Sequence, residues 1–84
     1  MLAKRIDGYA HVDDSQVCYW KSTDGWVLYL PGCGLGRISK HTVEEHPDGT
    51  ITVSPSIRMT THRANGEKVE RHGYLTRGAW MEVQ

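Results

Sequence analysis

The sequence predicts a mainly β fold with at most one short helix, built as a small single domain of antiparallel hairpins over residues 1–84. Three observations lead to this prediction. A chain of 84 residues is the size of one domain at most. Short runs rich in Val, Ile, Thr, Tyr and Trp alternate with turn signals at the spacing typical of small β domains. Apolar residues almost nowhere recur with the helical period.

The first predicted hairpin consists of "QVCYWK" and "WVLYL" on either side of "STDG". Asp-Gly favours a two-residue hairpin turn, because both central positions of that turn need positive φ. A turn at Asp24-Gly25 pairs Trp20 with Tyr29 and Tyr19 with Leu30. We expect each of these aromatic cross-strand pairs to stabilise the hairpin by up to about 1 kcal/mol.

The middle of the chain contains the best helix candidate, "SKHTVEEH" at residues 39–46, which Pro47 would end. "HPDGT" then predicts a turn that leads into a strand, "TITVS". Because proline cannot donate to a sheet ladder, we expect Pro55 to end that strand or to place it at a sheet edge.

The C-terminal part is predicted to form a three-stranded meander. "SIRMTTHR" and "KVERHGYLT" flank a turn at Asn65-Gly66, and "TRGA" turns into a last strand, "AWMEV". Counting outward from the Asn-Gly turn gives the pairs Arg63–Lys68, Thr61–Glu70, Met59–His72 and Ile57–Tyr74. Side chains alternate between the two faces of a strand. This register therefore places His72 and Tyr74 on the core side and Arg58, His62 and Arg71 on the wet side.

Charge and hydropathy narrow the classes of function. Lys and Arg together number 10, as do Asp and Glu, so the net charge is zero. Dedicated DNA-binding proteins are usually strongly basic, because phosphate neutralisation supplies much of their affinity. No stretch approaches the roughly 20 apolar residues of a membrane span, and the first residues lack the apolar core of a signal peptide. We therefore expect a cytoplasmic protein with no membrane partner, while contact with nucleic acid stays open.

Cysteine chemistry depends on that location. Thiols normally stay reduced in the cytoplasm, which favours free or metal-bound cysteines over a Cys18–Cys33 disulfide. Glycines flank Cys33, and such flexibility suits the tight turn of a metal knuckle. The alternative is a small, half-buried thiol in a glycine-rich loop. His41 and His62 could extend a cysteine–histidine set, but the spacing does not require it. A catalytic Cys33 lacks any supporting signature around it, so we predict no enzyme activity.

Three segments together resemble a group of small phage and prophage proteins. "PGCGLG", "DGTITVSPSI" and "HGYLTRGAW" match, in order and spacing over residues 26–82, a Cys-Pro-Gly-Cys-Gly knuckle, a Ser-Pro-Ser-Ile strand and a late Cys-His motif. The resemblance implies a fold like a zinc ribbon, with Cys33 and His72 as the retained ligands of one zinc. Leu30 stands at the first knuckle cysteine, and Glu70 or Arg71 stands at the late cysteine. With these ligands lost, we expect that no cofactor is bound.

The phage resemblance also implies a kind of function. It favours a non-enzymatic protein that binds a host protein or nucleoprotein complex, such as a counter-defence inhibitor of the anti-CRISPR kind. The predicted contact residues are the basic side chains of the last hairpin, namely Arg58, His62, Arg63, Arg71 and Arg77. The alternative is a structural zinc module that contacts protein or nucleic acid. A homodimer is a further expectation, because the edge strands of so small a sheet carry unpaired peptide groups that a second copy can bind.

Overall fold

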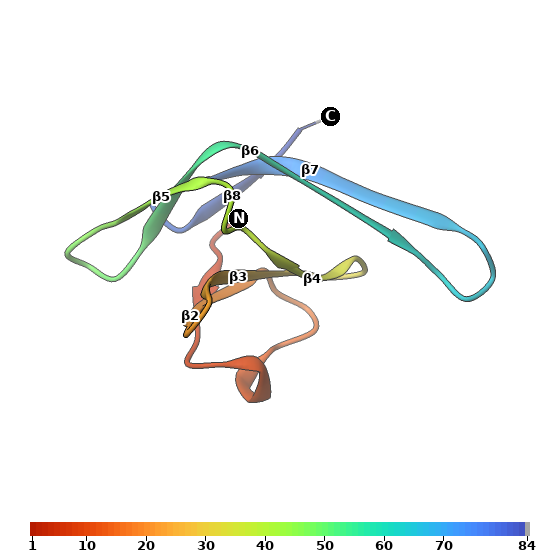
Figure 1. Cartoon of the computed structure of the whole chain (residues 1–84), viewed down its shortest axis with the longest axis horizontal. Coiled ribbons are helices and arrows are strands. Elements are labelled where there is room, and N and C mark those ends of the chain that lie inside the picture. Colours follow the sequence, from red (N-terminus) through yellow and green to blue (C-terminus); the bar gives the residue numbers. More distant parts are fainter. Residues whose placement is uncertain (84) are drawn as a thin grey trace.

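Two four-stranded sheets face each other in the computed structural model, which describes residues 1–83 (Figure 1). The first sheet has the order β1-β2-β3-β4, and the second has the order β5-β6-β7-β8. The strands of the first sheet are β1 (Lys4–Arg5), β2 (Cys18–Ser22), β3 (Gly25–Leu30) and β4 (Gly34–Arg37). Those of the second are β5 (Thr42–Glu45), β6 (Ile51–His62), β7 (Lys68–Thr76) and β8 (Ala79–Glu82). One short 3-10 helix, η1 (Tyr9–His11), lies between β1 and β2. The prediction of a mainly β chain with at most one short helix is confirmed.

The main core fills the space between the sheets. Alternation along the strands sends Tyr19, Leu28 and Leu30 from the first sheet toward Leu75 and Trp80 of the second, and all five are almost fully buried. Burying a side chain of this size stabilises the fold by about 1.5–3 kcal/mol. A second, smaller cluster lies on the opposite face of the first sheet, and it comprises Ile6, Cys18, Trp20 and Val27.

The first five residues tie the two sheets together along one side. Leu2 pairs with Ala79, and the N–H of Trp80 donates to the carbonyl of Met1 at 2.8 Å. Two residues later, Lys4 and Arg5 run parallel to β2 as β1. This segment therefore extends the second sheet at β8 and then crosses to the first sheet.

The first hairpin forms where expected, but its predicted register is wrong by two residues. Trp20 pairs with Val27 rather than Tyr29, and Tyr19 pairs with Leu28 rather than Leu30. The loop residues are Thr23 and Asp24, because Gly25 already belongs to the ladder opposite Ser22. A shift of two residues leaves every side chain on its predicted face, so the core is unaffected.

Residues 39–46 do not form the predicted helix. Thr42–Glu45 is instead strand β5, whose Val43 pairs with Val53 and packs against the core. The predicted turn at residues 46–50 is confirmed, with a hydrogen bond from Gly49 N–H to the carbonyl of His46 at 2.9 Å. That turn reverses the chain directly beside the strand that follows, so pairing with β6 outweighs the weak helical pattern of residues 39–46.

Pro55 does not end its strand. β6 continues through it for 12 residues, and the pairing with β7 is irregular between Val53 and Ile57. Proline is tolerated at such a bulge because no ladder bond needs its missing N–H. Pairing with β5 ends at Ser54, so β6 becomes an edge of the sheet from Pro55 onward. The expectation that Pro55 lies at a sheet edge is therefore confirmed.

The register of the last hairpin is wrong by one residue, and this shift has the larger consequence. The observed pairs include Met59–Arg71 and Arg58–His72, where the sequence predicted Met59–His72. The Arg63 N–H donates to the carbonyl of Glu67 at 2.8 Å, so the loop between them has three residues, Ala64 to Gly66, and Gly66 adopts a φ of 87°. A loop of this length places glycine in the left-handed position after a type I turn. Because a one-residue slip exchanges the faces, Arg71 points toward the core side and His72 points outward.

Candidate partner-binding surface

The outer face of the second sheet carries a group of exposed apolar side chains. Tyr74 and Met81 are cross-strand partners, and 48% of Tyr74 and 63% of Met81 are exposed. Leu2 lies opposite Ala79, so it shares this face, and it is 74% exposed. We call this group the outer patch, defined by Leu2, Arg58, His72, Tyr74, Met81 and Val83. Its members come from four neighbouring segments of one sheet, and the patch is therefore continuous.

Arg58 and His72 form the polar border of the outer patch. They are direct cross-strand partners, and Arg58 forms no ion pair with any residue in the range 1–83. The His72 ring is 6.5 Å from the Tyr74 ring, centroid to centroid, and its Nε2 lies 2.8 Å from Ser56 Oγ. The contacts with Tyr74 and Ser56 orient the His72 imidazole. The Arg58 guanidinium, which forms no ion pair within residues 1–83, is available to a partner molecule.

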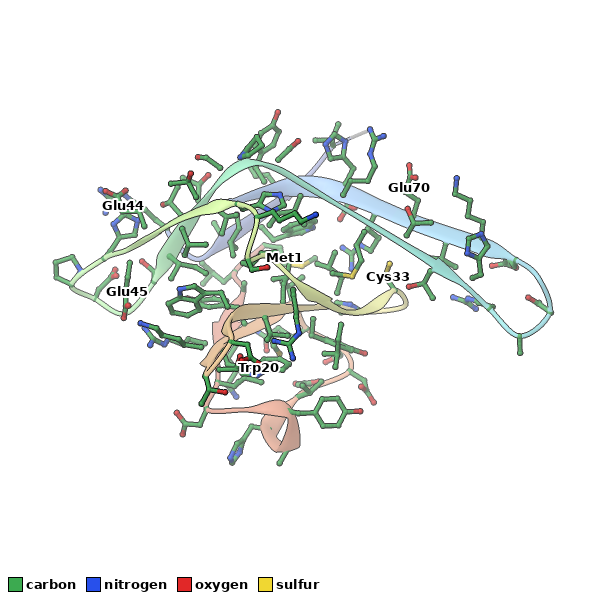
Figure 2. The ribbon with its side chains drawn as sticks, in the orientation of Figure 1. Met1, Trp20, Cys33, Glu44, Glu45 and Glu70 are labelled. Atoms are coloured by element: carbon green, nitrogen blue, oxygen red, sulfur yellow. The ribbon has the colours of Figure 1, made fainter. Side chains whose placement is uncertain are left out.

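Farther along the same face, the β6–β7 hairpin projects beyond the first sheet and carries charged residues (Figures 1 and 2). Lys68 Nζ is 3.9 Å from Glu70 Oε2, and both side chains are largely exposed. At the loop, Arg63 Nε is 3.8 Å from Glu67 Oε1. His62 is exposed near the end of β6. Exposed pairs of this kind contribute about 0–1 kcal/mol to stability, so these residues remain free to exchange partners.

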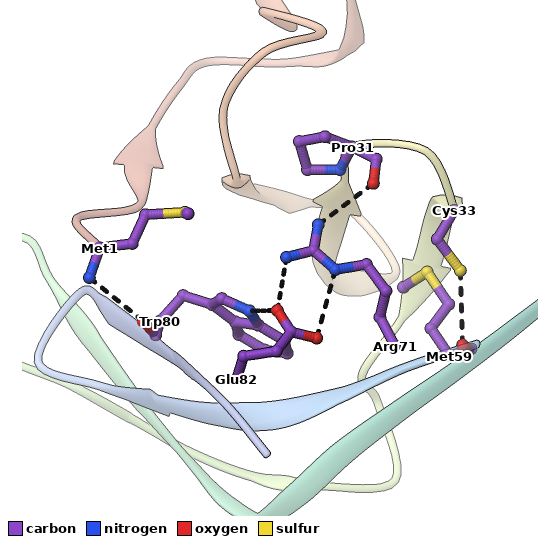
Figure 3. Close-up of polar contacts among 7 residues, drawn as sticks. All are labelled: Met1, Pro31, Cys33, Met59, Arg71, Trp80 and Glu82. Atoms are coloured by element: carbon purple, nitrogen blue, oxygen red, sulfur yellow. Dashed lines mark hydrogen bonds and ion pairs between the residues drawn. The ribbon is translucent and has the colours of Figure 1, made fainter. Parts of the chain in front are cut away.

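Arg71 belongs to a different surface from the other predicted contact residues. Its Nη2 donates to Glu82 Oε1 at 2.6 Å, and its Nη1 donates to the carbonyl of Pro31 at 3.1 Å (Figure 3). Its guanidinium also lies 5.9 Å from the centre of the Trp80 ring. The Arg71 hydrogen bond is the main cause that lowers the pKa of Glu82 below its usual value, with a second hydrogen bond from Trp80 adding to it. Arg71 thus fastens the β3–β4 turn to the second sheet.

Arg77 lies apart from Arg58, in the β7–β8 turn. It occupies the left-handed region with a φ of 46°, next to Gly78 at 75°. Its backbone N–H donates to Thr52 Oγ1 at 3.0 Å, which holds the turn against β6. The five basic residues grouped by sequence are therefore divided among the outer face, the hairpin loop, the inner face and this turn.

Cys33 and His72, the predicted zinc ligands, lie on opposite sides of the second sheet. Cys33 is 4% exposed, and its Sγ is 3.4 Å from the carbonyl of Met59 and 3.6 Å from Thr61 Oγ1. Thr61 shares the inner face with Met59, whereas His72 is on the outer face with Arg58. Within residues 1–83, no three His, Cys, Asp or Glu side chains come together as a possible metal site. The structure does not bring these two residues together.

The remaining cysteine and histidine candidates are also dispersed. Cys18 is buried in the cluster on the far face of the first sheet, and both cysteines are free thiols. His41 places its Nε2 3.1 Å from the carbonyl of Ser56, while its buried Nδ1 has no hydrogen-bond partner among the described residues. His41 therefore serves to position the chain between β4 and β5.

The apolar members of the outer patch are absent from the sequence-based set of site residues. The register predicted from the sequence is wrong by one residue and places Tyr74 on the core side. It assigns no face to Met81 or Val83 in the last strand. The alternation of "AWMEV", with Trp80 inward, was the signal that could have placed Met81 outside.

Comparisons with protein-family models, curated proteins and solved structures gave no match to this chain. Over residues 1–83, the structure contains no helix of sufficient length and apolar character to cross a membrane.

Proposed function

We propose that this chain is a non-enzymatic binding protein that contacts a protein or nucleoprotein partner through the outer patch. The observation that carries the proposal is the composition of that patch, in which Tyr74 and Met81 lie at the centre and Arg58 at the border. Tyr, Met and Arg are the residue types enriched where protein interfaces are fully desolvated. Exposed and continuous apolar surface of this kind commonly marks an interaction site.

The scaffold supports this use of the patch. The side chains that alternate with the patch residues point inward, and Leu75 and Trp80 among them are 0% and 2% exposed. Rigid strands hold Tyr74 and Met81 in a fixed relation, so binding would immobilise few additional groups. Preorganisation of this sort lowers the entropic cost of association.

The charge pattern favours a protein or nucleoprotein over free nucleic acid. The projecting hairpin carries Arg63 and Lys68, but Glu67 and Glu70 lie within 4.0 Å of them. A surface of alternating sign provides specificity and steering toward a complementary surface. This charge pattern and the resemblance of the sequence to phage proteins together make a host defence complex, such as a guided nuclease, the first class of partner to test.

The experiment measures the capture of partners from host lysate and of purified guided nucleases, with the parent chain and a set of variants as bait. Met81→Lys and Tyr74→Ala should each weaken capture by about tenfold or more, because central interface residues contribute about 2 kcal/mol when truncated. Both positions are substantially exposed, so we expect both variants to melt close to the parent protein.

Tyr9→Ala is the matched control for Tyr74→Ala, because Tyr9 is also an exposed tyrosine, at 67%, but lies in η1 and outside the second sheet. It should capture the partner as the parent does. Charge reversal at Arg58 should reduce capture. Charge reversal at Asp13 and Asp14, which are exposed in the acidic turn between η1 and β2, should leave capture unchanged. Unaltered capture by Met81→Lys and Tyr74→Ala, or loss on reversal of the two aspartates alone, would refute the assignment of this surface.

A further inference from the structure

Strand β4 is a free edge of the first sheet with hydrogen-bonding groups directed outward. β3 lies on one side of it, and the described residues place no strand on the other. The N–H of Ile38 donates to the carbonyl of Trp26 at 3.2 Å, which fixes the alternation of the ladder. Hydrogen-bonded and non-hydrogen-bonded pairs alternate in an antiparallel ladder. Leu28–Gly36 is therefore hydrogen-bonded, and Leu35 and Arg37 point their peptide groups away from β3.

The side chains of the same two residues line a shallow pocket of about 300 Å³, together with Trp20, Ser22 and Val27. Leu35 is 48% exposed although its neighbours in the pocket, Trp20 and Val27, are only 6% and 7% exposed. Strand β4 thus combines unpaired peptide groups with an adjacent, partly apolar pocket that is open to solvent.

Other edges of the molecule differ in this respect. Glu44 and Glu45 occupy the edge strand β5, and β1 has only two residues. The ends of β6 and β7 that extend beyond their pairing with β5 and β8 carry four polar or charged residues, Arg58, His62, Lys68 and Glu70. Charged and short edges are the devices by which natural sheets avoid pairing with another chain. β4 has one charged residue, Arg37, whose Nη1 lies 3.8 Å from Asp24 Oδ2 of the same chain.

We propose that β4 is the site at which two copies of this chain pair, edge to edge and antiparallel, about a two-fold axis at Gly36. In that register, Leu35 exchanges N–H···O bonds with Arg37 of the partner subunit, and the symmetry repeats the exchange. The two four-stranded first sheets become one continuous sheet. This inference is independent of the outer patch, which lies on the other sheet.

Three features of the edge suit a second copy. Gly36 falls at the closest approach of the two strands, where the absence of a side chain removes steric conflict. On the inner face of β4, the Met59 side chain occupies the space where a Cβ of Gly36 would lie. A glycine at this position therefore allows both the Met59 contact and the close pairing of the two β4 strands. Each copy brings one exposed Arg37 and one exposed Asp24, and the two-fold arrangement therefore adds no net charge at the contact. Leu35 of each copy reaches the open pocket of the other beside Arg37.

The test is sedimentation equilibrium of the whole chain over a wide concentration range, with amide hydrogen exchange by NMR as a second readout. We expect a monomer–dimer equilibrium, with exchange at the Leu35 and Arg37 amides slowing as dimer forms. Leu35→Lys, which puts a charge at the edge, and Leu35→Pro, which removes its outward N–H, should each raise the dissociation constant by tenfold or more. Circular dichroism checks that they fold, and if the proline variant does not, the lysine variant alone carries the test.

Met81→Lys is the control, and it should leave the dissociation constant unchanged. A chain that stays monomeric at every concentration overturns the proposal. So does a dimer that persists in the Leu35 variants, or one that Met81→Lys abolishes, because the latter would place the self-contact on the outer patch.

Discussion

Replacing Gly73 by alanine tests how β7 and β8 pack against the core. Gly73 lies on the inner face of β7, directly against the Trp80 indole. A Cβ atom added there would lie 2.5 Å from Trp80 Cζ2 and 2.5 Å from the carbonyl oxygen of Met81. Real Cβ atoms do not approach other heavy atoms so closely, so either the ring or the β8 backbone must move.

Neither group can move freely. Trp80 is 2% exposed, and its Nε1 donates to Glu82 Oε1 at 2.7 Å. Overpacking a core costs about 1–3 kcal/mol. The loss of glycine's freedom in the unfolded chain offsets this by about 0.4–1 kcal/mol. We therefore expect Gly73→Ala to lower the free energy of unfolding by about 1–2 kcal/mol. A domain of this size would then melt roughly 4–16 °C lower.

The assay is urea unfolding followed by tryptophan fluorescence, with the midpoint and the slope fitted for each variant. Gly8→Ala is the control, because an added Cβ at Gly8 meets nothing within 4 Å and the backbone there is extended, with a φ of 167°. It should leave stability unchanged or raise it slightly. An unchanged or higher midpoint for Gly73→Ala would show that the Trp80 ring does not rest on β7 as described.

Three further predictions concern Arg71, Glu82 and the two predicted zinc ligands. Arg71→Met should lower the free energy of unfolding by about 1–2 kcal/mol, because it removes the donor to the Pro31 carbonyl and leaves the Glu82 carboxylate with Trp80 as its side-chain donor. Arg58→Met should change the free energy of unfolding by less than about 0.5 kcal/mol, and urea midpoints compare the two variants. Because the pKa of Glu82 is lowered in the folded state, its stabilising contribution is present above the unfolded pKa of about 4.3 and is lost as the pH falls through the lowered value. Stability measured from pH 7 to pH 2 should therefore fall less steeply in Glu82→Gln than in the parent, and parallel curves would contradict this. Native mass spectrometry of protein purified without chelator should give a zinc-free mass, since the second sheet separates Cys33 from His72; one zinc per chain would show that the predicted ligands act after all.

The sequence by itself determined the β class and the places where the chain turns. Asp48-Gly49, Asn65-Gly66 and Arg77-Gly78 all lie in hairpin loops, because glycine adopts positive φ without a steric cost and this property is local. The same local reasoning found both aromatic strands of the first hairpin. It also identified Arg58 and His62 as exposed residues.

Register and the choice between helix and strand were decided only by tertiary structure. Asn65-Gly66 is compatible with a two-residue or a three-residue loop, and the difference of one residue decides whether Arg71 or His72 faces the core. The Trp80 ring fits beside Gly73 and not beside a larger residue, so packing favours the observed register. Residues 42–45 become a strand because Val43 finds Val53 across the ladder, a contact that no local pattern in the segment encodes. The outer patch follows from the same cause, since its members share a face only after the strands have paired.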